Sequence, residues 1–361
     1  IQKGKLFLSD DILHLKKQFT IDDFDKISEI ELKASNHTHG KKTLLKNVFQ
    51  VQASEYLIIN NDEVIDRNFF FTYAIEKESS DSYSSLKNKT IITFNNVFKR
   101  FIDSLNNRTI VVPLSGGFDS RLIAIMLKKY NYKNVVCYTY GRKDSFEIEN
   151  SRKTAKTLNF EWHFIEYKDD LISDFLITDE FKDYAHFAGK LSSMPNLQEY
   201  FAVKHLKKQK LISNDAIFVP GYAGDLLGGS QFLKVIPENL KQEQITDLII
   251  RKKFSNYPLS KTEKKTIKNQ VEQNLFHFDE NYVKKIPSSV FEDYDIKEKI
   301  AKYIFNSANF YTFFGYEHRF PFWDKELLDL FKKVPVKYKN MKMLFNTVLI
   351  NEYFKPNTVY F

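Results

Sequence analysis

The stretch that decides the fold is TIVVPLSGGFDSR, residues 109–121. It opens with β-branched and apolar residues over 109–114, which predict a buried strand. A pair of glycines follows, and from 120 to 130 the apolar residues recur at helical spacing. A strand, a short glycine-rich turn and a helix in direct succession aim backbone N–H groups and the positive end of a helix at one point. The stretch therefore predicts an anion-binding loop.

The side chains of this loop indicate which anion it binds. Gly116 and Gly117 permit positive φ and a close approach of the backbone to an oxyanion, and the hydroxyls of Ser115 and Ser120 add donors. The carboxylate of Asp119 would repel bound phosphates unless Mg²⁺ lay between them, so its presence predicts a metal–nucleotide complex. The loop has neither the lysine of a Walker motif nor the spacing of a dinucleotide fingerprint.

Outward from the loop, strand and helix patterns alternate along the chain. Such an alternation predicts an α/β fold with a parallel sheet and right-handed crossovers. Further on, residues 233–300 are rich in Lys and Glu and helical in character. The other predicted strands are 134–140, 162–165 and 216–220, and the predicted helix between the first two is 147–158.

A change in composition predicts the domain organisation. Residues 1–75 contain short runs of alternating polarity, which predict a β-rich first domain with a few short helices. Residues 76–90 are polar and Ser-rich and predict a linker. Residues 91–361 then form the second domain, which opens with a helix over 91–105. The strand candidates of the first domain are 5–8, 46–51 and 55–59.

Length and composition exclude several classes of protein. The 361 residues suit two domains, and a hydrophobic content of 43% supports a packed core rather than disorder. No apolar run approaches the ~20 residues of a membrane span, so we expect a soluble protein. A single cysteine, Cys137, excludes a disulfide framework and a cysteine-rich zinc site, and favours the reducing cytoplasm. Because the chain begins at Ile1 and ends on an apolar run, we expect a fragment truncated at its C-terminus.

The net positive charge favours a lysine-rich surface over a nucleic-acid interface. The 54 Lys and Arg residues exceed the 46 Asp and Glu residues by eight. Few of these cations are arginine, the residue on which base readout depends most. The lysines are scattered among acidic residues, which predicts a solvated surface and argues against a nucleic-acid partner. A face that meets polyanions is the alternative.

The loop motif S-G-G-x-D-S after a strand resembles the pyrophosphate-binding loop of N-type ATP pyrophosphatases, which cleave ATP between the α and β phosphates. Three later segments resemble motifs of asparagine synthetases, G-x-G-x-D-x-x-x-G-G, G-x-E-x-R-x-P-F-L-D and K-x-x-x-K-x-x-L. In this chain they are PGYAGDLLGG (220–229), GYEHRFPFWDK (315–325) and YKNMKML (338–344). The resemblance covers about residues 90–355 and implies a PP-loop synthetase domain of the adenine nucleotide alpha hydrolase type.

Residues 1–75 resemble the last part of the Ntn-type, class II glutaminase domain that precedes the synthetase domain in that family. There, an N-terminal cysteine attacks glutamine and releases ammonia. Cys137 lies in a predicted strand of the synthetase part. No residue of this chain can therefore be assigned to glutamine hydrolysis.

The resemblance implies ATP and Mg²⁺ as cofactors and assigns residues to the first chemical step. The backbone of Tyr140 would lie near adenine, and Gly221 would close on the adenylated substrate. Two carboxylates from separate strand ends, Asp119 and Asp225, are the predicted Mg²⁺ ligands. The residues assigned to ATP and pyrophosphate are Leu114, Ser115, Gly116, Gly117, Asp119, Ser120, Tyr140 and Gly221.

For the second step, the resemblance places Glu317 beside the acyl-adenylate, where it helps to deprotonate the nucleophile; an ion pair with Arg319 or His318 is the alternative. Lys342 would stabilise the adenylate and the developing pyrophosphate charge, with a plain surface lysine as the alternative. Tyr222 stands where asparagine synthetases usually carry an acidic residue. It resembles the β-lactam synthetase branch, in which a Tyr–Glu pair deprotonates an amine, and simple packing is the alternative.

The implied activity is that of an ATP-dependent amide ligase, with glutamine-hydrolysing asparagine synthase as the default. Its partners would be a small carboxylate and ammonia or glutamine-derived nitrogen, and a homodimer is compatible with the family. Tyr222 and a loop one residue short before Gly228 argue against free aspartate. Three alternatives stay open: amidation of a uronic acid or another surface-polysaccharide precursor, intramolecular lactam formation, and a non-catalytic nucleotide-binding scaffold.

Overall fold

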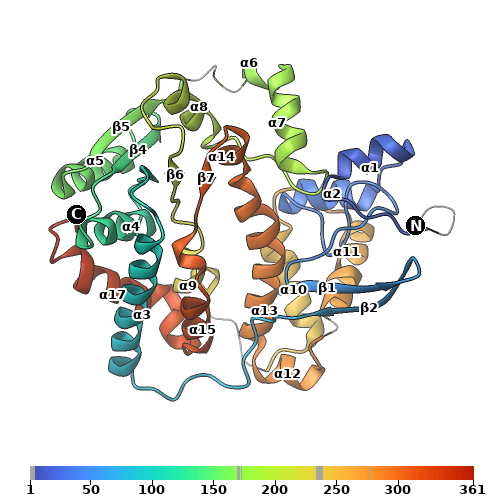
Figure 1. Cartoon of the computed structure of the whole chain (residues 1–361). Coiled ribbons are helices and arrows are strands. Elements are labelled where there is room, and N and C mark those ends of the chain that lie inside the picture. Colours follow the sequence, from blue (N-terminus) through green and yellow to red (C-terminus); the bar gives the residue numbers. More distant parts are fainter. Residues whose placement is uncertain (1–4, 169–170, 172, 233–238, 276) are drawn as a thin grey trace. The chain divides into compact units, whose positions relative to one another are not determined.

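The computed structural model describes residues 5–168, 171, 173–232, 239–275 and 277–361 (Figure 1). The chain divides into two compact units, each assembled from separate parts of the sequence. The first boundary falls at residues 74–75, but unit 1 also takes up two later segments that the sequence assigned to the second domain. Unit 1 contains Ile1–Ala74, Asp179–Pro195 and Ile236–Ser307, and unit 2 contains Ile75–Thr178, Asn196–Val235 and Ala308–Phe361.

Unit 2 is built on a five-stranded sheet with the order β5-β4-β3-β6-β7. Every neighbouring pair is parallel, which confirms the predicted α/β fold with a parallel sheet. The strand predicted over 216–220 pairs only at its centre. The strands are β3 (Ile110–Pro113), β4 (Val135–Gly141), β5 (Glu161–Glu166), β6 (Ile217–Phe218) and β7 (Glu317–His318).

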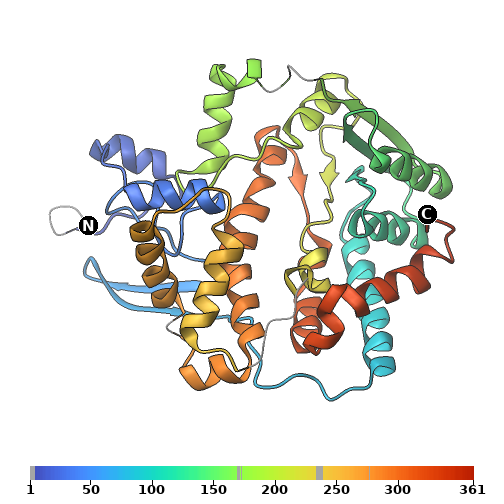
Figure 2. The ribbon, with the colours of Figure 1, turned by 180° about the vertical axis from the view of Figure 1, so that it is seen from behind.

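The burial of β3 and α4 explains the apolar sequence around the loop. β3 is central in the sheet and its first three residues are fully buried, as is typical of strands covered on both faces. α4 (Phe118–Lys129) follows directly and is buried from Ser120 to Leu127. It packs against η5 (Leu349–Phe354), close to the C-terminus (Figure 2). The crossover α5 (Phe146–Leu158) is capped by Ser145, whose side chain accepts a backbone hydrogen bond.

A cluster of aromatic rings joins the helices that cover the other part of unit 2. Phe94 of α3 (Tyr83–Asp103) lies 5.9–6.4 Å, centroid to centroid, from the rings of Phe322, Phe331 and Phe345. The remaining helical segments of the unit are α6 (Ser173–Leu176), α8 (Tyr200–Lys208), α9 (Gly224–Gly228), η1 (Ser230–Phe232), α14 (Asn309–Phe313), η3 (Pro321–Trp323), α15 (Lys325–Lys333), α16 (Val336–Lys339), η4 (Asn340–Lys342) and α17 (Met343–Val348).

The start of α3 corrects the predicted linker over 76–90. The helix begins at Tyr83, inside that stretch, rather than near residue 91. The side chain of Ser82 caps it by accepting a backbone hydrogen bond, and Leu86 and Thr90 already lie on its buried face. Serines therefore mark a helix N-terminus here, and the small number of apolar residues concealed the helical period.

Unit 1 combines helices with one antiparallel hairpin, β1 (Glu55–Asn60) and β2 (Glu63–Phe69). The hairpin includes the strand candidate at 55–59, whereas the candidates at 5–8 and 46–51 form no strand among the described residues. The helical character predicted for 233–300 is confirmed from residue 242 onward; 233–238 and 276 lie outside the described residues. The helices are α1 (Ile12–Phe19), α2 (Lys26–Ser35), α7 (Asp179–Gly189), α10 (Gln242–Lys253), α11 (Lys261–Asn274), α12 (Glu280–Lys285), α13 (Pro287–Asp295) and η2 (Ile296–Phe305).

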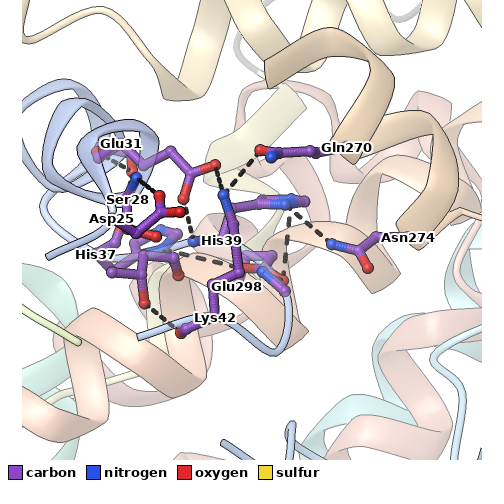
Figure 3. A network of polar contacts seen from close by, with 12 residues as sticks. Asp25, Ser28, Glu31, His37, His39, Lys42, Gln270, Asn274 and Glu298 are labelled. Carbon is purple, nitrogen blue, oxygen red and sulfur yellow. Dashed lines mark hydrogen bonds and ion pairs between the residues drawn. The ribbon is translucent and has the colours of Figure 1, made fainter. Parts of the chain in front are cut away.

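A buried network of charged and polar side chains holds the interior of unit 1 together (Figure 3). Glu31 of α2 accepts hydrogen bonds from the Lys42 side chain and from the backbone N–H of His39. Glu298 of η2 accepts bonds from Lys302 Nζ, at 2.8 Å, and from the backbone of Gly40. Both carboxylates thus have a lysine partner, which offsets part of the cost of burying their charge.

In the part of the chain that the structure describes, no helix is both long and apolar enough to cross a membrane.

Candidate active site

The carboxyl ends of β3, β4 and β6 open into a cavity of about 680 Å³ in unit 2. Ligands of parallel α/β sheets usually bind at this edge. Eleven of the twelve site residues predicted from the sequence line this cavity, although they come from separate parts of the chain. They are Leu114, Ser115, Gly116, Gly117, Asp119, Ser120, Tyr140, Gly221, Tyr222, Asp225 and Lys342.

The loop between β3 and α4 is organised by its own serines. Ser120 Oγ accepts a hydrogen bond from the backbone N–H of Ser115 (3.1 Å) and lies 3.1 Å from Ser115 Oγ. Ser115 Oγ in turn accepts from the N–H of Gly117 (3.1 Å). Neither glycine has the positive φ that the sequence suggested. Gly116 is needed for space instead, because a Cβ there would lie 3.0 Å from the Glu147 backbone.

Arg121 anchors the loop from inside the protein, a role that was not predicted from the sequence. Its guanidinium is buried and donates to the carbonyl of Gly116 and to the carbonyl of Val359, each at 2.8 Å. Burial lowers the pKa of Arg121. The sequence could have indicated this role, because Arg121 lies at the start of an otherwise apolar helix and a buried cation needs acceptors.

Asp119 lies in a tight enclosure formed by the loop after β6. A Cβ on Gly224 would lie 2.5 Å from Asp119 Cγ, and one on Gly221 would lie 2.9 Å from Asp119 Cβ. Only glycine at position 224 lets the backbone approach Asp119 so closely. No role was predicted for Gly224 from the sequence. Burial, and then the charge of Asp225, raise the pKa of Asp119 to about 8. The charge of Lys342 and a backbone hydrogen bond from Asp225 oppose this rise in pKa but do not outweigh it.

These residues fit a divalent cation bound together with phosphates. Asp119 Oδ1 is buried and has no hydrogen-bond partner among the described residues, and Asp225 supplies a second carboxylate from another loop. Mg²⁺ is usually held by one or two carboxylates and completes its shell with water and substrate phosphates. No group of three or more His, Cys, Asp or Glu side chains that could hold a metal ion occurs among the described residues.

Lys342 supplies the basic group of the cavity; it is the one Lys or Arg among the described lining residues. Its ammonium contacts Asp225 Oδ1. Met341 and Lys342 both adopt left-handed backbone conformations, with φ of 52° and 57°, which cost roughly 1–2 kcal/mol per residue. This strain places the lysine at the start of α17, facing the loop after β6.

One wall of the cavity is aromatic and contains a buried acid, Glu199. Its Oε1 accepts hydrogen bonds from the phenols of Tyr138 and of Tyr311, the latter at 2.5 Å. Burial raises the pKa of Glu199 to about 7, although the two phenols lower it. Tyr222 stacks on Phe320 with ring centroids 5.6 Å apart. Glu199 matches no motif, so the sequence could not reveal it.

Glu317 is the predicted site residue that the structure does not bring to the cavity. In β7 it pairs with Ile217, which in turn pairs with Ile110 at the start of β3. It therefore lies at the amino end of the strands, opposite the cavity. Its carboxylate accepts from Arg108 and from Arg319 Nε (2.6 Å). The ion pair with Arg319, which the sequence left as the alternative, is the arrangement observed.

The family profile described as asparagine synthase matches residues 105–349, which is more than half of the chain. The chain belongs to the asparagine synthase family. The match includes the phosphate loop, the loop after β6 and Lys342, so the residues that meet in the cavity all fall within the family's domain.

Individual relatives are more distant. A 7-cyano-7-deazaguanine synthase from Sulfurihydrogenibium sp. (strain YO3AOP1) is 38% identical over 63 residues, which is 17% of this chain. The chain spans only 28% of the length of that relative. The assignment therefore depends on the family profile and on the parallel sheet.

Solved structures with a similar chain path include an NH3-dependent NAD synthetase from Campylobacter jejuni, with 16% identity, a TM-score of 0.28 and coverage of 60% of this chain and 96% of that one. NMN synthetase from Francisella tularensis has 12% identity, a TM-score of 0.26 and coverage of 73% and 97%. The U34-tRNA thiolase NcsA from Methanococcus maripaludis has 15% identity, a TM-score of 0.26 and coverage of 71% and 82%.

Proposed function

We propose that this protein is an ATP-dependent ligase that activates a carboxylate as its adenylate and converts it to an amide. The observation that carries the proposal is the convergence, in one cavity, of the loop over 115–120 with Asp119, Asp225 and Lys342. A carboxylate substrate attacks the α-phosphorus of ATP and pyrophosphate leaves. An amine or ammonia then attacks the acyl carbon, and AMP leaves.

The first step uses the residues at the phosphate loop. The N-terminal N–H groups of α4 and the hydroxyls of Ser115 and Ser120 would bind the β and γ phosphates. Asp119 and Asp225 would hold Mg²⁺, which neutralises charge on the phosphates. Lys342 would stabilise the negative charge that develops on the leaving pyrophosphate. The contact between Lys342 and Asp225 keeps that ammonium at the mouth of the loop before substrate binds.

The identity of the acid and of the nitrogen donor forms the finer part of the proposal. The default is asparagine synthase, with aspartate as the acid and ammonia from glutamine as the donor. In that case residues 1–75 correspond to the end of a glutaminase-like domain. Tyr222 lines the cavity and favours a second candidate, an intramolecular cyclase similar to β-lactam synthetases, because asparagine synthetases usually carry an acidic residue at this position.

Exchange of radiolabelled pyrophosphate into ATP tests the first step, because it requires adenylation and nothing later. We expect exchange that depends on one acid of a panel containing aspartate, uronic acids and amino-bearing carboxylates. We expect Asp119→Asn to reduce exchange at least about 100-fold, as loss of a metal-held electrostatic contact does. Asp103→Asn is the matched control, since Asp103 is exposed and pairs with Lys99 on α3. Unchanged exchange in Asp119→Asn would contradict the proposal.

A further inference from the structure

Glu199 has the placement of a functional group rather than of a structural one. It directly precedes α8 and reaches a wall of the cavity, while the residue is only 5% exposed. Tyr138 of β4 and Tyr311 of α14 both donate to Oε1, so two separate elements fix the orientation of the carboxylate. No described residue donates a hydrogen bond to Oε2. That oxygen is left to accept a proton from a molecule in the cavity.

Among the described residues, the groups that act on Glu199 are phenols, and no cation pairs with it. Tyr138 and Tyr311 contact the carboxylate directly, and the phenols of Tyr140 and Tyr167 lie close enough for their pKa values to be raised by its charge, in addition to their burial. A buried carboxylate without a cation is costly, and packing alone gives no reason to retain one. A carboxylate that gains a proton near neutral pH is instead suited to general base catalysis.

We propose that Glu199 is the general base that accepts the proton of the amine attacking the acyl-adenylate, and that the wall around it, with Tyr222, is the subsite for that amine. This inference rests on the proposed function and replaces the role that the family resemblance implies for Glu317. The subsite takes amines or ammonia: Glu199 accepts from N–H, and the aromatic faces of Tyr140 and Tyr222 suit a cationic nitrogen before it loses its proton.

The step balances as follows. The amine nitrogen uses its lone pair to form a C–N bond with the acyl carbon, and the carbonyl π pair moves to oxygen. The resulting ammonium transfers one proton to Glu199 Oε2. The carbonyl re-forms as the bond between the acyl carbon and the AMP oxygen breaks, and AMP leaves with that electron pair. The proton on Glu199 passes to solvent through the open cavity.

The decisive experiment compares two steps in the same variants of the full chain. Pyrophosphate exchange reports adenylation, and amide formation reports attack by the amine, with ammonia and with a primary amine as donors. We expect Glu199→Gln, which is isosteric, to leave exchange within about 3-fold of the unaltered protein and to slow amide formation at least about 100-fold. Hydroxylamine, whose nitrogen loses its proton more readily, should restore part of the rate as hydroxamate.

Two further measurements exclude a merely structural role. Amide formation in the unaltered protein should fall as the pH drops below about 7, because the base becomes protonated, and Glu199→Gln should lack this limb. Since both phenols lower the pKa of Glu199, Tyr311→Phe should move the limb to higher pH. Glu149→Gln is the control, an exposed acid of α5 paired with Arg152. If Glu199→Gln does not fold, the same comparison of exchange and amide formation is made with Glu199→Asp.

Three results would overturn the inference. An equal loss of exchange and of amide formation in Glu199→Gln would show a role in binding the acid or in folding. Unchanged amide formation would show that the base lies elsewhere. Absence of exchange in the unaltered protein with every acid would remove the proposed function itself and this inference with it, and it would be seen before any Glu199 variant was made.

Discussion

Glu298 in unit 1 and the two buried carboxylates of the unit 2 cavity, Asp119 and Glu199, have pKa values shifted in opposite directions. In unit 1, burial alone would raise the pKa of Glu298, but Lys302 and the nearby imidazoles outweigh it and lower the pKa to about 2. In unit 2, burial raises the pKa of Asp119 to about 8 and that of Glu199 to about 7. Glu298 has a lysine as its direct partner. In the cavity, phenols are the direct partners of Glu199, and Oδ1 of Asp119 has no partner among the described residues; a substrate and Mg²⁺ would supply the missing partners.

This difference distinguishes a structural network from a site. The unit 1 network includes two histidines, His37 and His39, beside buried carboxylates, so residue type alone would favour it as the functional centre. Its imidazoles are kept neutral, because burial lowers the pKa of His37 to about 4 and that of His39 to about 3. What distinguishes the cavity is Glu199, an acid held only by phenols, together with two carboxylates, Asp119 and Asp225, that share a single lysine.

The largest effect is expected where a buried charge loses its partner. Lys302→Met would leave Glu298 buried without its nearest cation and should lower the free energy of unfolding by about 3–5 kcal/mol. Chemical denaturation followed by circular dichroism measures this. Lys284→Met removes an exposed partner of Glu280 in the same unit and should change stability by less than about 1 kcal/mol. Equal effects of the two variants would contradict the structural role of the network.

Asp119→Asn should have the opposite effect on stability. The carboxylate has an oxygen without a partner and lies near Asp225, so a neutral amide of the same shape removes a repulsion. We expect the melting temperature to stay unchanged or to rise by a few degrees, corresponding to about 1 kcal/mol, while exchange is lost. Such an inverse relation between stability and activity is typical of functional sites. A clear loss of stability would assign Asp119 to the structural class.

The two regions should also respond to pH with opposite signs. His37 and His39 have pKa values in the folded state below the ordinary 6.5, so the stability they contribute above that pH is lost as the pH falls through about 4 and 3. Glu199 has a pKa raised above 4.5, so its contribution is present below that pH and is lost as the pH rises through about 7.

A comparison of unfolding midpoints at about pH 5 and about pH 8 separates these contributions. Glu199→Gln should stabilise the protein relative to the unaltered chain at the higher pH and should have little effect at the lower one. His37→Gln should reduce the destabilisation by acid. If Glu199→Gln raised the stability equally at both pH values, Glu199 would be ionised at both, and this would contradict the prediction.

The smallest effect is expected at the amino end of the strands. Glu317 is partly exposed and is paired with Arg108 and Arg319, and exposed ion pairs contribute little. Glu317→Gln should lower the free energy of unfolding by less than about 1 kcal/mol, measured as above. A loss comparable to that of Lys302→Met would show that this pair is part of a more tightly coupled structure.

The strand, loop and helix over 109–130 could be predicted from the sequence, as could the parallel sheet and most of the cavity lining. The strand, loop and helix depend on backbone preferences and apolar spacing over a few consecutive residues. Most residues of the cavity motifs directly follow predicted strands, so their location at strand ends could be predicted as well. Glu317 also belongs to a motif, but its placement depends on the register between β6 and β7, where it pairs with Ile217. The spacing of residues within a motif cannot show whether one of them lies at the amino end or at the carboxyl end of paired strands.

The residues that the sequence could not reveal share one property, contact with distant parts of the chain. Glu199 is bonded to phenols 61 and 112 residues away, and Arg121 reaches a carbonyl 238 residues away. The order of residues determined that a phosphate loop exists and which family it belongs to, because that information is local. The tertiary structure decided which buried carboxylates have a lysine as direct partner and which do not, because such pairs form between segments that are distant in the sequence and close in space.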